Sequence, residues 1–294
     1  MSRLIAFFVR LASQVARRLP RRLQLLIGDG LGWFAFSVVR LRRKMLDEHI
    51  KLAFPEWTER QRKHVALRSL QHSGRSLIEY FTLPSVDRVW VDKNVQITGW
   101  EHYEAARKSD KGVLMLTLHV GNGDLALAVL ALMGLRVGIV SKRFKSKELN
   151  DVWFGLRKKE GLEIIPEEKS SYQILKFLKQ KGCVVFVLDQ FMGPPVGVKT
   201  TFFGKETGTA AGLALFAERS GAPVLPAYTY RERDGKTHLV FEAPHWASEI
   251  DEADLDKKIV RLTQHYTDII EGIVRKHPDQ WLWLHRRWKT FEVR

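Results

Sequence analysis

Residues 112–126 of the 294-residue chain form the stretch GVLMLTLHVGNGDLA. Its first seven residues are a short apolar run, which predicts a buried strand. Gly121 and Gly123 then allow a sharp turn, and the apolar pattern over 124–133 predicts a helix. His119 therefore lies at the carboxyl end of the predicted strand, directly before the turn.

The same alternation of strand and helix continues along the chain. From about Val89 short apolar runs alternate with amphipathic segments, a pattern typical of βαβ units in a mainly parallel sheet. We therefore expect an α/β fold over residues 85–294, with a mainly parallel central sheet flanked by helices and ligands bound at the carboxyl ends of the strands. The predicted strands lie at 112–118, 136–142, 162–166, 183–189, 222–230 and 238–243, and the predicted helices at 124–133, 146–159, 170–180, 208–219 and 254–276.

Residues 1–84 differ because their pattern is helical throughout. In the first twenty residues the apolar side chains share one helical face, while Arg3, Arg10 and Arg17 lie on the other. This pattern predicts a helix that lies in a membrane interface, although a core helix with a solvated basic face would show the same periodicity. We expect a helical membrane-associating region over residues 1–84, before the α/β domain.

Residues 23–39 form a second apolar segment, in which Asp29 is the only charge. The segment is at the lower limit of the roughly 17 to 25 residues that are needed to cross a bilayer. Basic residues flank both of its ends, so the positive-inside rule predicts no orientation in the membrane. Its glycines and Asp29 favour a peripheral or half-inserted anchor over a full span. Thr58 and Gln61 then form a plausible capping box for a helix that Pro84 ends.

The composition favours anionic partners. Lys and Arg number 48 against 33 Asp and Glu, a formal net charge of +15, which attracts nucleic acid, an anionic membrane surface, phosphorylated substrates or an acidic carrier protein. With 9 Trp and 16 Phe the chain suits a membrane interface best among these. We find no zinc-finger, RNP-like or basic-zipper pattern, so nucleic-acid binding is the weaker alternative. The single cysteine, Cys183, can form no internal disulfide and fits a reducing compartment.

His119 and Asp124 could form an acid/base pair across the predicted turn. The carboxylate in the first turn of the helix would fix the imidazole tautomer and stabilise the imidazolium. The spacing alone leaves two other interpretations open, a histidine satisfied at a strand end and an ordinary N-terminal helix residue. Because no serine or cysteine nucleophile lies nearby, direct transfer to an external hydroxyl is favoured. The scarcity of nearby His and Cys makes a metal site less favoured.

Several blocks, in order along the chain, are similar to those of one family. HVGNGD (119–124) matches an H-x4-D/E motif, and it is followed by RKKEG, VLDQ, TTFFGKETGTAAGLALFAERSGAPVLPAY and PDQWLWLHRRWK, with AFPEWTERQ upstream. Together they resemble the bacterial lipid A late acyltransferases (lauroyl and myristoyl transferases), a branch of the lysophospholipid acyltransferase superfamily, over nearly the whole chain.

The chain departs from the usual family patterns at two positions, and both bear on which acceptor it uses. The lipid A branch commonly has glutamate where this chain has Asp124. Glycerolipid acyltransferases usually have asparagine where this chain has Leu118, and no EGTR-like block is found here. A lysophospholipid or other glycolipid O-acyltransferase therefore stays open as the alternative acceptor class, and a non-catalytic membrane scaffold as an alternative without activity.

The resemblance also implies the site. His119 matches the general base, Asp124 its orienting acid, Arg157 a basic residue near the reacting centre and Asp189 a carboxylate beside the site. The substrate-binding residues that we expect are Gly121, Asn122, Lys142, Arg143, Gln190, Phe203, Gly204, Arg286 and Arg287.

The C-terminal block carries Trp281, Trp283 and Trp288 around Arg286 and Arg287. This pattern indicates an interfacial or phosphate-binding segment, or aromatic core packing with an exposed basic end.

The activity that the resemblance implies is transfer of a fatty acyl group from an acyl carrier protein thioester to a hydroxyl of a lipid A precursor. Such an enzyme needs neither a metal nor a tightly bound cofactor. We expect it at the cytoplasmic face of a bacterial inner membrane, on an anionic lipid surface, with a phosphorylated glycolipid or lysolipid as acceptor and no nucleic-acid partner.

Overall fold

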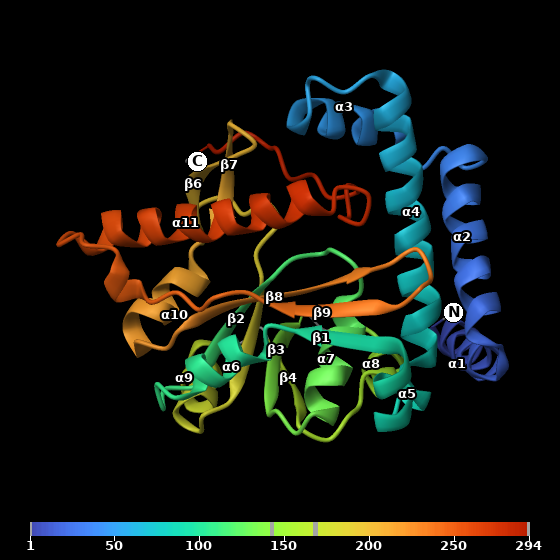
Figure 1. Cartoon of the computed structure of the whole chain (residues 1–294), viewed down its shortest axis with the longest axis horizontal. Helices are drawn as coiled ribbons and strands as arrows, with labels where there is room; N and C mark the ends of the chain where they lie inside the picture. The colour runs from blue at the N-terminus through green and yellow to red at the C-terminus, as the bar shows by residue number, and fades with distance from the viewer. Residues whose placement is uncertain (1, 142–143, 167–169, 293–294) are drawn as a thin grey trace.

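The central element is a mixed, mostly parallel β-sheet. The computed structural model describes residues 2–141, 144–166 and 170–292, and within them the sheet has seven strands in the order β1-β9-β8-β2-β5-β3-β4. Neighbours are parallel except β8 and β9, which form an antiparallel pair. This confirms the predicted α/β fold (Figure 1). The strands are β1 (Val95–Thr98), β2 (Val113–Thr117), β3 (Val137–Ser141), β4 (Leu162–Pro166), β5 (Cys183–Val187), β8 (Val224–Arg231) and β9 (Thr237–Phe241).

Strand β2 lies at the middle of the sheet and is buried on both faces. Leu114 and Leu116 join one hydrophobic cluster, and Val113 and Met115 join the other, because successive side chains of a strand point to opposite faces. Cys183, the single cysteine, is buried on the neighbouring strand β5.

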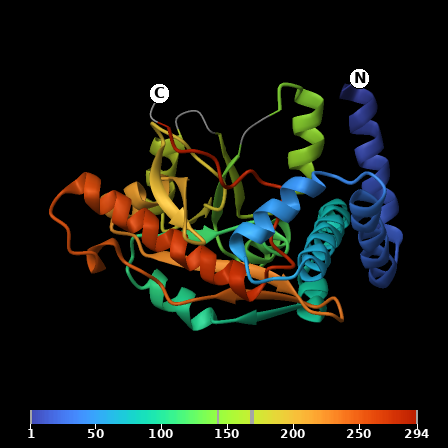
Figure 2. The same cartoon turned by 90° about the horizontal axis from the view of Figure 1, so that it is seen from above.

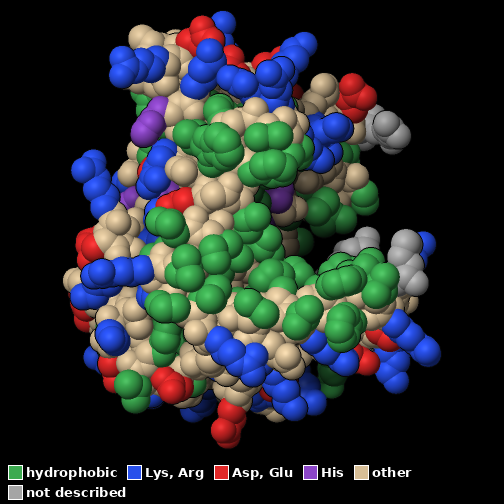
Figure 3. Space-filling model, turned by 90° about the vertical axis from the view of Figure 1, so that its right-hand side faces the viewer, with side chains coloured by type: hydrophobic (Ala, Val, Ile, Leu, Met, Phe, Trp, Pro, Cys, Tyr) green, Lys and Arg blue, Asp and Glu red, His purple; other side chains and the backbone are tan. Residues whose placement is uncertain are grey.

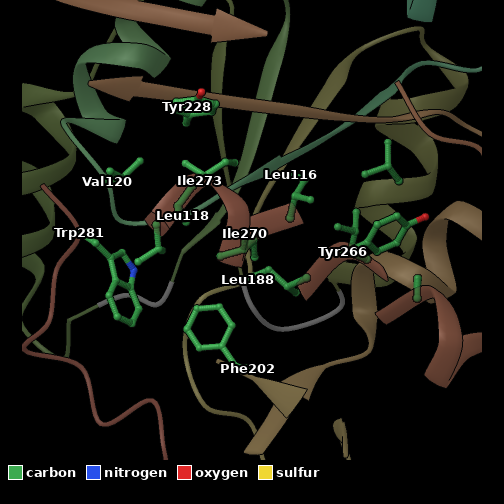
Figure 4. Close-up of a cluster of buried hydrophobic side chains, with 14 of the residues drawn as sticks. Leu116, Leu118, Val120, Leu188, Phe202, Tyr228, Tyr266, Ile270, Ile273 and Trp281 are labelled. Atoms are coloured by element: carbon green, nitrogen blue, oxygen red, sulfur yellow. The ribbon is translucent and has the colours of Figure 1, made fainter. Parts of the chain in front are cut away.

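Helices cover both faces of the sheet (Figures 1 and 2). The cluster of Leu114 and Leu116 also contains side chains of α9, α10 and α11, and the cluster of Val113 and Met115 contains side chains of α6, α7 and α8. Figure 4 shows part of the first cluster, in which Ile270 and Ile273 of α11 are labelled together with Leu116 of β2. The helices of this part are α5 (Arg88–Asn94), α6 (Trp100–Arg107), α7 (Gly123–Leu132), α8 (Lys147–Leu156), α9 (Ser170–Lys179), α10 (Gly212–Ser220) and α11 (Leu255–Lys276), with short 3-10 turns η1 (Leu83–Ser85) and η2 (Ala247–Glu249).

The first part of the chain is helical, as predicted. The capping box of Thr58 and Gln61 at the start of α4 is confirmed. Two turns of α2 pack against α4 almost backbone to backbone, because a Cβ on Gly32 would lie 2.3 Å from Gln71 Cα and one on Gly28 would lie 2.5 Å from Arg75 Cα. The helices are α1 (Ser2–Arg18), α2 (Arg21–Ser37), α3 (Arg43–Ala53) and α4 (Glu59–Thr82).

Asp29, the charge inside the apolar segment of α2, faces α4. Its two carboxylate oxygens accept hydrogen bonds of 2.6 Å from Arg75 Nε and Nη2. No helix of the described residues combines the length and apolar character needed to cross a bilayer. The boundary at residue 84/85 stays a prediction, and one hydrophobic cluster contains both Leu70 of α4 and Leu116 of β2.

One predicted helix is partly wrong. The segment 208–219 begins as a strand, since β7 (Lys205–Ala210) pairs with β6 (Gly197–Phe202) in an antiparallel hairpin, and α10 starts only at Gly212. Thr207 and Thr209 are fully buried in β7, where Thr207 donates to the carbonyl of Arg287 and Thr209 bonds to Thr200. The partner of Thr207 lies 80 positions later in the chain, and polar residues interrupt any apolar run in both strands, so local apolar periodicity did not reveal the hairpin. Strand β1 and helices α5 and α6 were also not predicted.

Candidate active site

His119 and Asp189 meet because their strands are neighbours. In the parallel pair of β2 and β5, Thr117 lies opposite Val187. His119 follows Thr117 by two residues, and Asp189 follows Val187 by two residues. The distance from His119 Nδ1 to Asp189 Oδ1 is 2.8 Å, and the backbone N–H of His119 donates to Oδ2 at 2.9 Å. An ionised carboxylate only accepts, so Nδ1 carries the proton and Nε2 is the ring nitrogen left for a substrate.

Asp189 is held rigidly. Its side chain is fully buried, and Trp281 Nε1 donates to Oδ2 at 2.7 Å. Burial alone would raise the pKa of Asp189, but the charge of His119 and these hydrogen bonds lower it well below its usual range. Burial would likewise lower the pKa of His119, but Asp189 reverses this, with a smaller contribution from Asp124, and the pKa of His119 is raised. Asp189 thus stabilises the charged form of the His119 ring relative to the same ring in water.

The predicted pairing of His119 with Asp124 needs correction. Asp189 occupies the position against Nδ1, and Asp124 instead forms an ion pair of 2.7 Å with Nε of Arg157. The Nε–H bond of Arg157 does not point at the carboxylate oxygen, so the contact is an ion pair and not a hydrogen bond. Asp124 lies in the first turn of α7 and Arg157 directly after α8. Burial raises the pKa of Asp124, and the charge of Arg157 opposes that rise.

Two cavities meet at His119 and Asp124. The first, called the apolar cavity here, extends between α7 and the sheet, and its wall is hydrocarbon apart from Thr117, His119, Asp124 and Arg157. The second, called the α4 cavity here, lies against α4 on the other side of the loop. The lining of the apolar cavity includes Met115, Leu127, Leu130, Ile139 and Val185, and that of the α4 cavity includes Ser73, Ser76, Tyr80, Gly121, Asn122, Trp153 and Leu282.

Residues 119–122, the active-site loop, are fixed by backbone contacts. The carbonyl of His119 accepts from Leu282 N at 2.9 Å, and the carbonyl of Gly121 accepts from Ser76 Oγ at 2.9 Å. Gly121 has a φ of +61°, and a Cβ there would lie 2.2 Å from the carbonyl oxygen of Thr229. Only glycine fits this position, because both the backbone angle and the close approach exclude a side chain.

Asn122 caps helix α7 and is buried. Its Oδ1 accepts from Leu125 N at 3.1 Å, the usual N-cap interaction. Together with Gly121 it lines the α4 cavity, as expected for a residue at the site.

The other predicted substrate-binding residues are more scattered. Gln190 is exposed next to Asp189, and Arg286 is exposed in the C-terminal segment. Phe203 and Gly204 form the tip of the β6–β7 hairpin, where Phe203 is buried against Phe54 and Trp288 and lines neither cavity. Lys142 and Arg143 lie outside the described residues.

Arg287 is not placed to bind a substrate. It is 1% exposed and donates to the carbonyls of Gln190 and Gly208 and to Thr209 Oγ1, and burial lowers its pKa to about 10. Trp281 and Trp283 are fully buried as well. The aromatic core-packing alternative for this segment therefore holds, but its basic end is only partly exposed, because Arg287 is buried and ties the β6–β7 hairpin to the loop after β5.

The sequence did not single out His285. Its ring lies edge-on to that of His119, with 4.6 Å between centroids, and its Nε2 is 3.4 Å from Gln190 Nε2. Burial lowers the pKa of His285, and the positive charge of His119 lowers it further. A neutral imidazole thus stands beside the ionisable one. Only its place in the block PDQWLWLHRRWK pointed to it. Among the described residues, no three His, Cys, Asp or Glu side chains group to hold a metal ion.

The family of bacterial lipid A biosynthesis acyltransferases matches residues 1–290 of the chain. The protein belongs to this family. It is therefore an acyltransferase, as the resemblance implied.

The sequence identity to individual relatives is low. The chain is 25% identical over 273 residues to the lipid A biosynthesis lauroyltransferase of Escherichia coli strain K12, and the aligned region covers 90% of this chain and 84% of that protein. It is 23% identical over 282 residues to the palmitoleoyltransferase of the same organism, covering 94% and 88%. It is also 24% identical over 223 residues to the phosphatidylinositol mannoside acyltransferase of Mycolicibacterium smegmatis, covering 75% and 71%.

Proposed function

We propose that this acyltransferase moves a fatty acyl group from an acyl carrier protein thioester to a hydroxyl of a lipid A precursor, with His119 as general base. The observation that carries the proposal is the His119–Asp189 pair at the junction of the apolar cavity and the α4 cavity. Nε2 of His119 accepts the hydroxyl proton as the hydroxyl oxygen attacks the thioester carbonyl. The tetrahedral intermediate then expels the thiolate, which takes the proton from Nε2, so ester and thiol are the products.

Asp189 and Arg157 have different roles in this scheme. Asp189 keeps Nδ1 protonated and stabilises the imidazolium that forms during attack. Arg157 lines the apolar cavity beside His119 and supplies positive charge near the developing oxyanion, a contribution that is often large in acyl transfer. Asp124 holds Arg157 in place through their ion pair.

The apolar cavity suits the acyl chain of the donor. Met115, Leu127 and Leu130 offer hydrocarbon contacts from two elements, and burying a methylene group contributes about 0.8 kcal/mol. The chain would enter beside His119, which places its thioester carbonyl next to the base.

The N-terminal helices support binding to a membrane surface. On α1 the buried residues Ala6, Ser13 and Ala16 are small, while the large side chains of Phe7 and Phe8 are 58% and 57% exposed. Helix α1 is thus not a core helix with a solvated basic face. Figure 3 shows hydrophobic side chains gathered along this side of the molecule, next to a hollow and flanked by Lys and Arg. The exposed apolar residues of α1 and α2, called the apolar face here, are Leu4, Ile5, Phe7, Phe8, Leu11, Val15, Leu23, Leu26, Ile27, Leu31, Trp33 and Phe34.

An apolar face with basic neighbours lies in the headgroup region of a bilayer, and anionic lipids strengthen the binding. We infer that the enzyme docks on the cytoplasmic face of the inner membrane, where carrier protein and lipid acceptor meet. One observation supports another class of acceptor. The chain is similar to a phosphatidylinositol mannoside acyltransferase, so another glycolipid or a lysophospholipid is the alternative acceptor.

The test is an acyl-transfer assay in detergent micelles. Labelled acyl carrier protein and the matching acyl coenzyme A are each offered with an under-acylated lipid A precursor or with a lysophospholipid. The wild type is compared with His119→Ala and with a matched control, His102→Ala on α6. We expect transfer from the carrier protein to the lipid A precursor that is lost only in His119→Ala. Activity that survives without His119 contradicts the mechanism, and a preference for coenzyme A or for the lysophospholipid contradicts the proposed donor or acceptor.

A further inference from the structure

A buried carboxylate on α4 lies behind the active-site loop. The Glu79 side chain is 2% exposed and has partners from three other parts of the fold. It accepts from Asn122 Nδ2 at 2.7 Å, from Arg231 Nη2 at 2.5 Å and from Arg21 Nη2 at 3.1 Å. Arg231 ends β8 and Arg21 begins α2. Burial alone would raise the pKa of Glu79, but these partners lower it, so the carboxylate is ionised.

Glu79 determines which way the amide of Asn122 points. An ionised carboxylate only accepts hydrogen bonds, so the NH2 group of Asn122 must face Glu79. The amide oxygen then faces Leu125 N and caps α7. The backbone N–H of Asn122 donates to Thr229 Oγ1 at 2.8 Å, which fixes the loop from the sheet side.

This orientation controls the catalytic groups on either side of Asn122. His119 lies three residues before it, in the active-site loop, and Asp124 lies two residues after it, in the first turn of the capped helix. We propose that Glu79 is a positioning residue for acyl transfer: its carboxylate orients Asn122 and thereby places both His119 and the Asp124–Arg157 pair. The inference rests on the proposed function, although the residues that it uses lie outside the proposed base and ion pair.

The hydrogen-bond pattern allows a sharp test, because Asn122 Nδ2 and Arg231 Nη2 donate to the same oxygen of Glu79, Oε2, while Arg21 donates to Oε1. In Glu79→Gln the amide oxygen can take the place of Oε2 and keep Asn122 oriented, while the amide nitrogen faces Arg21, which still donates to the carbonyl of Gly235. In Glu79→Leu no acceptor remains for the Asn122 amide. In Asn122→Asp two carboxylates face each other.

We expect Glu79→Leu and Asn122→Asp to lower kcat by about 10- to 100-fold, as a small misplacement of reacting groups does, with less effect on KM. Glu79→Gln should keep kcat within a few-fold of the wild type. The matched control is Asp29→Asn, which breaks the bidentate ion pair with Arg75 across the same α2–α4 contact. It should lower Tm while kcat stays unchanged.

A second readout does not depend on turnover. Amide hydrogen exchange at residues 122–125 should become faster in Glu79→Leu and stay slow in Glu79→Gln and in Asp29→Asn. Two results would overturn the inference: a kcat for Glu79→Leu that falls only as far as that of Asp29→Asn at matched loss of Tm, or a kcat for Glu79→Gln that falls as far as that of Glu79→Leu. If Glu79→Leu does not fold, the comparison of Asn122→Asp with Glu79→Gln gives the same decision.

Failure of the proposed function looks different. In that case the wild type does not use the lipid A precursor or does not need His119, while the exchange of hydrogen at 122–125 still reports on Glu79.

Discussion

At the scale of single residues, the proposed chemistry depends on how Asp189 tunes His119. The carboxylate is fully buried and bonds both to the ring and to the backbone of the histidine. It therefore fixes tautomer, orientation and charge at once. A surface carboxylate could fix none of these as firmly, because water would compete for its oxygens and screen its charge.

The pH profile tests this dependence. The pKa of His119 is raised, and the base must be neutral, so kcat/KM should fall as the pH drops through a value above the ordinary 6.5 of histidine. In Asp189→Asn the carboxylate charge is lost, the pKa of His119 falls, and the acid limb should move to lower pH. The plateau should also fall, by about 10²- to 10⁴-fold, because the tautomer is no longer fixed. An acid limb that does not move would show that Asp189 does not tune the base.

Trp281→Phe tests the support behind Asp189. The change removes the indole N–H that donates to Oδ2 while it keeps most of the aromatic packing. A hydrogen bond to a charged group contributes about 1.5 to 3 kcal/mol, so we expect a loss of that size in the free energy of unfolding, measured by urea denaturation. The neighbouring Trp283 donates to the uncharged carbonyl of Pro278 instead, so Trp283→Phe, as a control, should lose only the about 0.5 to 1.5 kcal/mol of a typical neutral hydrogen bond.

The sequence predicted much of this site, but not how its parts pair. His119, Asp124, Arg157 and Asp189 were all expected near the reacting centre, and the structure brings them together. The pairing of Asp189 with His119 depends on β2 and β5 being neighbours, and the order of strands in a sheet is not visible in local periodicity. The role of Arg287 could not be predicted for a similar reason, since its acceptors lie some 80 to 100 positions earlier in the chain.

At the scale of elements, the contact of α2 with α4 depends on glycine. Gly28 and Gly32 of α2 lie on the same helical face, and Gly74 of α4 is so close that a Cβ there would lie 2.1 Å from the carbonyl oxygen of Gly28. From the sequence, the glycines within residues 23–39 were evidence only against a membrane span, and Gly74 was not singled out. Their physical use is close helix packing, which the sequence of one helix could not reveal without its partner.

Gly32→Ala should therefore destabilise the fold. Its methyl group would meet backbone atoms of Gln71 and Leu70, which cannot move aside, and overpacking of this kind costs typically about 1 to 3 kcal/mol. Gly30→Ala is the matched control in the same helix, because nothing lies within 4 Å of its Cβ position. It should raise stability by up to about 1 kcal/mol through helix propensity. Thermal unfolding of both variants checks the pair, and equal shifts would contradict the close contact.

The predicted elements were most accurate where a continuous apolar run marks the element in the sequence itself. Strands with continuous apolar runs, such as 113–117 and 183–187, lie within the predicted ranges. The β6–β7 hairpin was missed because its residues are mostly polar or small. Strand β1 was missed because it is only four residues long and pairs with β9, far along the chain.

At the scale of the whole molecule, the proposed membrane docking combines positive charge with the apolar face. In this proposal the net charge of +15 attracts anionic surfaces, and Phe7 and Phe8 add apolar contact. The two contributions can be separated by experiment, because salt screens only the first.

Vesicle flotation tests this division. The wild type should bind vesicles that contain an anionic lipid, and binding should weaken but persist as salt increases. Phe7→Glu/Phe8→Glu should lose binding at every salt concentration while its Tm hardly changes, since both side chains are already exposed. The control Val89→Glu changes an exposed apolar residue of α5 and should bind as the wild type does. If the double variant still floats, α1 is not the docking element.

The buried position of Cys183 has a practical consequence. It is 1% exposed, and burial raises the pKa of its thiol to about 11, so the reactive thiolate is scarce at neutral pH. Maleimide and methanethiosulfonate reagents should therefore leave the native protein unmodified. A fluorophore or a spin label can then be attached to a single cysteine introduced at a chosen exposed position, without first removing the natural one. Placed along α1 in turn, such labels would measure how deeply each part of the helix lies in a bilayer.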